Sequence, residues 1–376
     1  MREAMSKKLL CTIPDFKKPY EIEIGEGLLF SHTSYLSSLT SHCAIITDDQ
    51  VTQLYGDRLK EFLSSFGLEA HIFSFQHGEQ HKTRATKELL EDRLFEKGLG
   101  RDTCIIALGG GVVTDIAGYI AATYCRGLPL VMIPTSLLAM ADASIGGKTG
   151  VNVPYGKNMV GCIYQPTKTL IDPLTLKTLP KNELANGVVE MIKHGLIADY
   201  AFFEYLEKQH KELLDLDSVT LEKAIFESCR IKKEIVEEDE KESGRRRLLN
   251  FGHTIGHALE SVSHYSISHG EAVAIGLIVE SYLSVELGAL QPNTLDRIQK
   301  IVRQYALPLR LPSPYPVHAL LDAMMLDKKS VNRRPRFTVI DGIGVPHSYD
   351  SAYCTPIEES LVIKALQWMN NDLCCH

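Results

Sequence analysis

The fold of this chain is decided by one stretch, TCIIALGGG at residues 103–111. A run of residues typical of a buried β-strand leads directly into three glycines, and helix-like spacing of apolar residues continues through Ala122. Glycines at a strand end permit positive φ angles and let a ligand approach the backbone closely. The free N–H groups at the start of the next helix attract phosphate. The stretch therefore predicts a strand–turn–helix unit of an α/β fold, with an anion site at the turn.

The same alternation extends to both sides of this stretch. Strand-like runs and helix-like patterns follow one another at residues 42–47, 53–66, 71–75, 83–97 and 130–134. Strands that alternate with helices predict a parallel sheet flanked by helices. We therefore expect residues 1–180 to form an α/β dinucleotide-binding domain with a parallel sheet.

From about Lys181 onward, long helical periodicities replace this alternation. They cover residues 182–197, 221–237, 254–262, 271–287 and 295–305. Apolar residues recur at helical intervals with charged residues between them, as in helices that bury one face. We expect an all-α domain over residues 181–376, with the domain boundary near Pro180.

Length and composition exclude several classes of protein. The 376 residues suit two domains, and 40 Lys plus Arg against 47 Asp plus Glu give a formal charge of −7, which argues against nucleic-acid binding. The nine cysteines form no C-x-x-C pair, which favours a reducing compartment. The longest apolar stretch, residues 128–143, is broken by Pro134 and Asp142 and is too short to cross a bilayer. These features predict a cytoplasmic protein with no membrane or nucleic-acid partner.

The glycine triplet alone is a weak sign of nucleotide binding. It is not the G-x-G-x-x-G fingerprint, and the candidate ribose acid, Asp48, precedes it, so a tight turn without a ligand stays equally open. Asp115, one turn into the helix, and Thr135-Ser136 at the next strand end favour the nucleotide. Because no arginine lies near Asp48 in sequence, NAD is favoured over NADP.

A second glycine-rich segment, SIGGKTG at residues 144–150, lacks the four-residue spacer of a Walker A phosphate loop, which disfavours an ATPase. Its Lys148, together with Lys157 and Asn158, offers charges and an amide for an anionic small molecule.

The second half of the chain carries a candidate metal site. The segment LNFGHTIGH at residues 249–257 sets two histidines one helical turn apart, HGE at 269–271 adds a third, and EMIKH at 190–194 supplies a carboxylate. Neutral imidazoles and an ionised carboxylate are ligands that a divalent metal requires. Thr254 stands where a metalloprotease helix has its general-base Glu, so that class is disfavoured. From the residues alone, a structural role for any one of these side chains stays open.

Taken together, these segments resemble the 3-dehydroquinate synthase family. The matching stretches stand in the family's order at residues 109–115, 134–148, 156–158, 190–193, 248–257 and 269–271. The resemblance covers about residues 48–328. It implies a sheet-based NAD domain followed by a helical domain, with the active site in the cleft between them. It also implies a homodimer in which Arg126 reaches into the partner's site.

The resemblance implies specific roles for individual residues. The implied ligands of a zinc or cobalt ion are Glu190, His253 and His269. The implied NAD-binding residues are Asp48, Glu79, Lys82, Gly110, Gly111, Asp115, Thr135, Ser136, Asp142, Lys148, Lys157 and Thr178. The implied substrate-binding and catalytic residues are Arg126, Lys148, Asn158, Lys193, Lys232, Glu242, Arg246, Asn250, His257 and Lys328. Gln50 departs from the family pattern, where an Asn is expected, and His194 receives no role.

The implied reaction converts 3-deoxy-D-arabino-heptulosonate 7-phosphate to 3-dehydroquinate and phosphate, a lyase step of the shikimate pathway. NAD oxidises carbon 5 transiently, phosphate leaves by β-elimination, hydride returns, and an aldol step closes the ring. His257 is the candidate for proton handling near carbon 5. Three other functions stay open: a sugar-phosphate cyclase acting on glucose 6-phosphate or sedoheptulose 7-phosphate, a polyol dehydrogenase such as glycerol dehydrogenase, and a regulatory NAD-binding module. Arg246 with Lys232 favours a substrate that carries a carboxylate.

Overall fold

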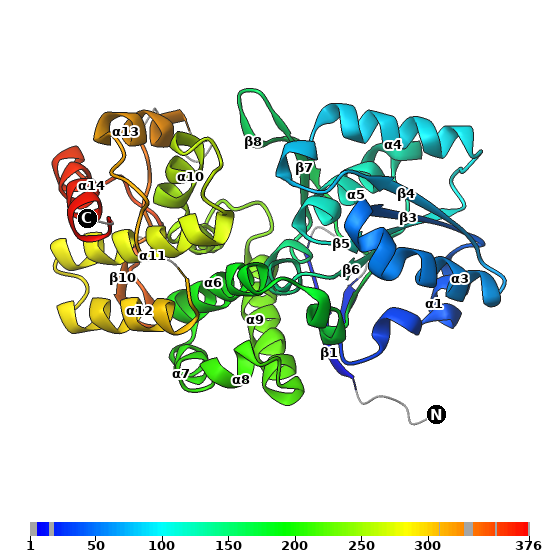
Figure 1. Ribbon diagram of the computed structural model, residues 1–376, viewed down its shortest axis with the longest axis horizontal. Coiled ribbons are helices and arrows are strands. Elements are labelled where there is room, and N and C mark those ends of the chain that lie inside the picture. Colours follow the sequence, from blue (N-terminus) through cyan, green and yellow to red (C-terminus); the bar gives the residue numbers. More distant parts are fainter. Residues whose placement is uncertain (1–5, 15–18, 308, 327–333, 350–351, 375–376) are drawn as a thin grey trace. The chain divides into compact units, whose positions relative to one another are not determined.

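The computed structural model describes residues 6–14, 19–307, 309–326, 334–349 and 352–374 (Figure 1). The chain folds into two compact units. Unit 1 joins Met1–Pro180 to Leu221–Lys233, and unit 2 joins Lys181–Thr220 to Glu234–His376. In the described part of the chain, no helix combines the length and the apolar character needed to cross a membrane.

Unit 1 is built on a seven-stranded sheet of order β1-β2-β9-β6-β5-β3-β4. Its strands are β1 Lys7–Cys11, β2 Tyr20–Ile24, β3 His42–Asp48, β4 Glu69–Phe75, β5 Thr103–Gly109, β6 Leu130–Pro134 and β9 Lys168–Ile171. Every neighbouring pair is parallel except β1 with β2. The four strands expected from the sequence are confirmed as β3 to β6. The parallel sheet expected from the sequence is confirmed, and β1 adds an antiparallel strand at its edge.

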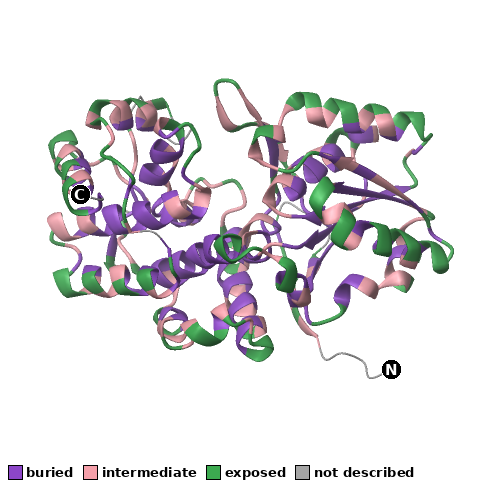
Figure 2. Cartoon of the chain, in the orientation of Figure 1, coloured by how far each residue is buried: buried purple, intermediate pink, exposed green. Residues whose placement is uncertain are grey.

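Helices cover both faces of this sheet because successive strand residues point to opposite sides. Ile105 and Ala107 of β5 pack with helices α4 (Arg84–Glu96) and α5 (Gly111–Thr123). Cys104 and Ile106 of the same strand pack on the other side with α1 (Thr33–Leu39) and α3 (Asp57–Ser65). Figure 2 shows the buried central strands and the exposed outer faces of α3 and α4. The strand–glycine–helix unit predicted at residues 103–111 is therefore confirmed.

Short elements complete unit 1. The helix predicted at residues 53–66 starts earlier in the structure. It begins with the short α2 (Asp49–Val51), continues as the π-helix η2 (Thr52–Gly56) and ends as α3. The SIGGKTG segment enters a hairpin, β7 (Lys148–Val153) and β8 (Gly156–Ile163), so it does not form the loop-to-helix turn of an ATPase. The remaining elements are the short helices η1 Leu28–Phe30, η3 Glu79–His81, η4 Tyr124–Arg126, η5 Ala139–Ala143 and η6 Pro173–Thr178.

Unit 2 is mostly helical. Its helices are α6 Lys181–Ala198, α7 Tyr200–Lys208, α8 His210–Leu214, η7 Arg245–Asn250, α10 His253–Val262, α11 His269–Glu286, α12 Pro292–Gln304, α13 Val317–Leu326 and α14 Glu359–Asp372. A small antiparallel pair, β10 (Ile340–Gly342) with β11 (Val345–Pro346), corrects the expectation of an all-α domain. All five predicted helices of the second half are present.

The helix α9 (Ser218–Glu238) belongs to both units. Its segment Leu221–Lys233 packs with unit 1, where the Cys229 thiol donates a hydrogen bond to the carbonyl of Met140 over 3.3 Å. From the sequence we expected residues 181–376 to form one continuous domain. The packing of Leu221–Lys233 with unit 1 was not predicted.

Two helices of unit 2, α10 and α11, pack at very close range because glycines line their contact. Gly252 precedes α10 with a φ of 79°, which a side chain rarely adopts. A Cβ added to Gly276 of α11 would lie 1.9 Å from the carbonyl oxygen of Gly252. No side chain fits there, so these glycines fix the first turn of α10 against α11.

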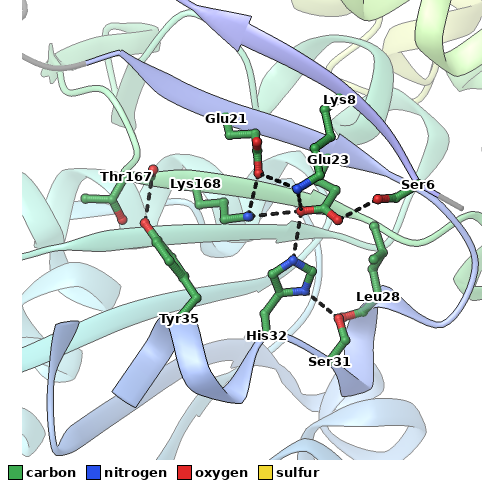
Figure 3. A network of polar contacts seen from close by, with 10 residues as sticks. All are labelled: Ser6, Lys8, Glu21, Glu23, Leu28, Ser31, His32, Tyr35, Thr167 and Lys168. Carbon is green, nitrogen blue, oxygen red and sulfur yellow. Dashed lines mark hydrogen bonds and ion pairs between the residues drawn. The ribbon is translucent and has the colours of Figure 1, made fainter. Parts of the chain in front are cut away.

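A polar network joins the neighbouring strands β2 and β9 of the unit 1 sheet (Figure 3). Glu23 of β2 accepts a hydrogen bond from Ser6 over 2.6 Å and lies 3.0 Å from the ammonium of Lys168 on β9. The ring of His32 lies 2.8 Å from the same carboxylate. Burial opposes the ionisation of Glu23, but these contacts lower its pKa from 4.5 to about 2. Because the shift is downward, its stabilising effect is present above pH 4.5.

We expect this network to make unit 1 sensitive to acid. The stabilisation by the Glu23 carboxylate, roughly 3 kcal/mol, is lost progressively as the pH falls from 4.5 toward 2. In Glu23→Gln, the free energy of unfolding should be lower at pH 7 and should depend less on pH in that range. Urea denaturation at several pH values measures both effects, and parallel pH profiles for the two proteins would contradict the role of Glu23.

Candidate functional site

Three predicted metal ligands converge in unit 2. Glu190 lies on α6, His253 is the first residue of α10, and His269 is the first residue of α11. The Glu190 Oε1 atom lies 3.4 Å from His253 Nε2 and 3.6 Å from His269 Nε2. One donor atom from each residue falls within 4.8 Å of the other two. Helix α6 and the consecutive helices α10 and α11 thus present one carboxylate oxygen and two imidazole nitrogens to one point.

These separations suit a tetrahedral metal ion. Zinc bonds of about 2.0–2.1 Å at tetrahedral angles hold neighbouring donor atoms roughly 3.3–3.4 Å apart. The two observed separations, 3.4 and 3.6 Å, need only a small contraction to reach this value. Three protein ligands leave one position for a substrate oxygen, as in catalytic zinc sites. The donor set therefore fits the divalent metal that the sequence predicts.

Each imidazole is also held through its second nitrogen. The Nδ1 atom of His253 lies 3.2 Å from the carbonyl oxygen of Phe251, and Nδ1 of His269 lies 3.4 Å from Oε2 of Glu260. When Nδ1 donates its proton to these acceptors, Nε2 is the nitrogen that carries a free lone pair. Both rings therefore direct a possible metal-binding nitrogen toward Glu190.

The charges around Glu190 compensate its burial. Its side chain is only 1% exposed, and it forms an ion pair with the equally buried Lys193. Burial opposes ionisation, but Lys193 and the ring of His253 hold the pKa of Glu190 well below its usual range. Burial also opposes a charge on His269, but its contacts with Glu190 and Glu260 raise the pKa of His269 to about 9. The site thus stabilises a positive charge next to the ionised carboxylate of Glu190. A bound metal cation would supply such a charge.

A further buried carboxylate supports the helix that carries His253. Glu280 of α11 accepts hydrogen bonds from the backbone N–H groups of Thr254 and Ile255, over 3.1 and 3.4 Å. The residue before α10, Gly252, has no side chain with which to satisfy those groups. Glu280 therefore takes the place of a capping residue and holds the start of α10 in position.

Other predicted residues of unit 2 lie close to these ligands. The ring of His257 is centred 5.4 Å from that of His253 and 6.2 Å from that of His269. Asn250, the last residue of η7, donates a hydrogen bond to Glu242 over 2.5 Å. Arg246 is buried, and its guanidinium donates a hydrogen bond to the carbonyl of Glu240. Lys328 lies outside the described residues.

In unit 1, the predicted cofactor residues gather around the start of α5. Gly110 precedes this helix, and no side chain caps it. One turn later, Asp115 forms an ion pair with Lys82, whose ammonium also donates a hydrogen bond to Asn158 over 2.6 Å. Burial raises the pKa of Asp115 above its usual value, although the ammonium of Lys82 opposes the shift. Thr135 and Ser136 follow β6, the neighbour of β5 in the sheet.

The other predicted residues of unit 1 lie at several places. Asp48 accepts a hydrogen bond from the backbone N–H of Val51 over 2.8 Å, and burial raises its pKa. Lys232, from the α9 segment of this unit, lies 2.7 Å from the carboxylate of Asp142. The remaining members have these positions: Lys157 lies 3.9 Å from Glu79, Thr178 bonds to Tyr55 over 2.7 Å, Gly111 begins α5, and Lys148 begins β7 with an exposed side chain.

Three predicted site residues adopt a strained backbone. Arg126, Asn158 and Glu242 have φ angles of 70°, 53° and 60°, although none of them is glycine. Such conformations cost about 1–3 kcal/mol and cluster at functional sites. Six other non-glycine residues of the described chain also have positive φ angles, so this strain alone does not mark a site.

Three polar residues that contact the predicted site residues were not predicted from the sequence. Asn152 donates a hydrogen bond to Glu79 over 2.8 Å and accepts one from the backbone N–H of Asn158 over 2.9 Å. The other two are Glu260 and Glu280, described above. Glu260 follows His257 by three residues, so helical spacing could have placed it beside the histidines. No signal in the sequence marks Glu280, because its partners are backbone groups of another helix.

Most of the chain is similar in sequence to proteins of one known family. Residues 72–186 match the family model described as 3-dehydroquinate synthase N-terminal, and residues 187–330 match 3-dehydroquinate synthase C-terminal. The 3-dehydroquinate synthase of Pelotomaculum thermopropionicum is 44% identical over 331 residues, which are 87% of this chain and 89% of that protein. The 3-dehydroquinate synthase of Desulforamulus reducens is 42% identical over 330 residues, 87% of this chain and 92% of that protein.

Two solved structures have the same fold as this chain over nearly its whole length. A 2-deoxy-scyllo-inosose synthase complexed with carbaglucose-6-phosphate, NAD⁺ and Co²⁺ is 26% identical, with a TM-score of 0.88 over 96% of this chain and 99% of that one. The 2-epi-5-epi-valiolone synthase of Streptomyces hygroscopicus subsp. jinggangensis 5008, with NAD⁺ and Zn²⁺ bound, is 29% identical, with a TM-score of 0.85 over 95% and 99% of the two chains.

Proposed function

The chain belongs to the 3-dehydroquinate synthase family, and from that premise we propose how its own side chains serve the reaction. It is an enzyme of the shikimate pathway, a lyase that eliminates phosphate. The proposed substrate is 3-deoxy-D-arabino-heptulosonate 7-phosphate, which carries a phosphate, a carboxylate and several hydroxyl groups. The observation that carries the proposal is the convergence of Glu190, His253 and His269 on one point.

Glu190, His253 and His269 are the proposed ligands of one zinc or cobalt ion. Both metals suit imidazole and carboxylate donors, and solved relatives hold Zn²⁺ or Co²⁺. A bound divalent ion would polarise a substrate hydroxyl and favour its alkoxide. Lys193 keeps Glu190 ionised, and so keeps it able to bind a cation. His257, beside both imidazoles, is the proposed group for moving a proton at the substrate's carbon 5.

NAD is the proposed cofactor, since both solved relatives contain it. The uncapped start of α5 after Gly110 offers N–H groups to a pyrophosphate, and Asp48 offers a carboxylate oxygen to a ribose. When bound, NAD would accept hydride from the substrate and return it within one turnover. The other proposed contacts are those listed from the sequence: Glu79, Lys82, Gly111, Asp115, Thr135, Ser136, Asp142, Lys148, Lys157 and Thr178.

The anionic groups of the substrate require cations and amides. We assign the phosphate to Lys148, Asn158, Asn250 and Lys328, and the carboxylate to Arg246 with Lys232. Arg246 is fully buried, and a buried guanidinium is suited to bidentate recognition of a carboxylate. Glu242, which accepts the hydrogen bond from Asn250, is placed among the groups around the sugar hydroxyls.

The deciding experiment follows phosphate release from the heptulosonate phosphate in the presence of NAD and Zn²⁺, while NADH absorbance is recorded. One phosphate per substrate without net NADH is the expected result, because the hydride returns in each cycle. Accumulation of NADH would indicate a polyol dehydrogenase instead. Activity only on glucose 6-phosphate or sedoheptulose 7-phosphate would indicate another sugar-phosphate cyclase. Binding of NAD with no reaction on any of these substrates would indicate a regulatory module.

A homodimer is the proposed assembly, with Arg126 acting in the partner's site. Arg126 is exposed and held at a φ of 70°, so its side chain projects from a strained turn. Mixing Arg126→Ala subunits with His269→Ala subunits should restore part of the activity, since one mixed site would keep both groups. No recovery in mixed dimers would contradict a role across the interface. The cytoplasmic location expected from the sequence stays a prediction.

A further inference from the structure

We infer that Glu260 is a positioning residue of the metal site, which fixes the ring of His269 so that Nε2 points toward Glu190. The inference rests on the proposed function, because it assumes that His269 binds the metal. Glu260 belongs neither to the proposed ligand set nor to the predicted substrate-binding residues. It lies on α10, while His269 begins α11, so it acts on the neighbouring helix.

The first support is geometric. Oε2 of Glu260 lies 3.4 Å from Nδ1 of His269, while Nε2 of the same ring lies 3.6 Å from Oε1 of Glu190. The ring is therefore placed between two carboxylates that contact its opposite nitrogens. Rotation about the side-chain bonds would break both contacts at once. A ring held in this way pays little entropy when it binds a cation.

The second support is burial. The side chain of Glu260 is 3% exposed, whereas that of His269 is 31% exposed. A surface carboxylate near a histidine would move freely and would be screened by water. A buried carboxylate is costly unless it is hydrogen-bonded or paired, so its orientation is well defined. Glu260 is thus a buried support for the more exposed imidazole.

The third support is a reciprocal arrangement of the two helices. Glu260 of α10 holds the histidine that begins α11, and Glu280 of α11 holds the first backbone N–H groups of α10, where His253 stands. His253 itself is oriented by the carbonyl of Phe251 over 3.2 Å. Both imidazoles therefore receive support from outside the ligand set, one from a carboxylate and one from the backbone.

A competing explanation makes Glu260 a ligand. His257, Glu260 and His269 also place donor atoms within 4.8 Å of one another, so a second ion could bind there. The Nδ1 atom of His269 cannot both carry the proton that faces Glu260 and bind a second cation. The two explanations therefore predict different numbers of bound ions, one or two per chain.

The test measures Co²⁺ stoichiometry, affinity and visible absorption for the full chain, with a chelator as competitor. Glu260→Gln keeps the shape and an acceptor oxygen but loses the charge, and Glu260→Met removes the acceptor. We expect one ion per chain in both variants, with affinity weaker by about 10-fold in the first and about 100-fold in the second. The absorption bands of bound Co²⁺ should keep their tetrahedral intensity, because the ligands are unchanged. Glu286→Gln, at the other end of α11, is the matched control and should bind as the parent protein does.

Each other result has a defined meaning. Unchanged affinity in both Glu260 variants would overturn the inference, while loss of the ion in His269→Ala would leave the proposed function intact. Retention of the ion in His269→Ala would instead contradict the proposed ligand set. Two ions in the parent and one in Glu260→Met would make Glu260 a ligand. Because a destabilised variant could lose metal for another reason, the melting temperature of each metal-free protein is measured as well. An affinity loss that simply follows a lower melting temperature would also overturn the inference.

Discussion

Replacing His269 with alanine is expected to remove the bound divalent ion and to slow phosphate release roughly a thousandfold, which corresponds to about 4 kcal/mol of lost transition-state stabilisation. His269 supplies one of the two imidazole nitrogens that lie within 3.6 Å of Glu190 Oε1 among the described ion pairs. With one carboxylate and one imidazole left, no closed set of three ligands remains. The measurements are metal content after dialysis and the rate of phosphate release at saturating NAD.

This variant tests the metal site without an expected loss of fold. The His269 side chain is 31% exposed and begins its helix, so alanine disturbs little packing. The buried Glu260 and Glu190 each lose one cationic neighbour, so the melting temperature of the metal-free variant is measured as well. Removing Glu190 would be harder to interpret, since the buried ammonium of Lys193 would lose its ion pair. His318→Ala, an exposed histidine on α13, is the matched control and should leave metal content unchanged. Full metal content in His269→Ala would exclude that residue from the ligand set.

The sequence predicted local structure well where one element carries its own signal. The run from β5 through the glycines into α5 was predicted because strand, turn and helix are adjacent in the chain. The strands β1, β2 and β9, which follow one another from one edge of the sheet, were not predicted. They are short, and β9 pairs with β2 from across the chain; the network that joins them links Lys168 to Glu21, 147 residues apart. The periodicity of apolar residues within one segment does not show which distant strand it pairs with.

Contacts between residues distant in the chain were also the hardest part of the site to predict. Spacing placed His253 and His257 on one helical face, but it could not bring Glu190 of α6 to them. The residue types made Glu190 a candidate ligand, and the family resemblance then assigned it to the same ion as His253 and His269. Glu260 could have been placed beside the histidines by its helical spacing. Glu280 could not, because a buried carboxylate cannot be told from a surface charge until its neighbours are known. Arg246 and Lys232, predicted to bind one carboxylate together, belong to different compact units, and their joint role stays a prediction.

Replacing Lys82 with methionine is expected to lower the free energy of unfolding by about 3 kcal/mol at pH 7.5 and to weaken NAD binding. Lys82 is 5% exposed, and its ammonium pairs with Asp115 and donates to Asn158. Methionine fills much of the same space but leaves the Asp115 carboxylate, 18% exposed, without this cation. Burial already raises the pKa of Asp115, and losing Lys82 removes an interaction that opposes the rise.

The sign of the pH effect follows from that shift. A carboxyl group whose pKa is higher in the folded state binds more protons there, so folding becomes less favourable as the pH rises through the raised pKa. Lys82→Met should therefore be most destabilised at neutral and alkaline pH, and should recover part of its stability when the pH is lowered toward the pKa of Asp115. Equal destabilisation at every pH would contradict an unpaired carboxylate as the cause.

The double variant Lys82→Met/Asp115→Asn separates packing from cofactor binding. Without the carboxylate, no buried charge is left, and most of the lost stability should return. NAD affinity should stay low, because both side chains are proposed to lie against the cofactor. Urea denaturation gives the stabilities, and equilibrium titration gives the affinity. Recovery of both properties together would mean that the pair only supports the fold around Asn158 and the start of α5. Recovery of stability alone would assign Lys82 and Asp115 to the NAD site itself.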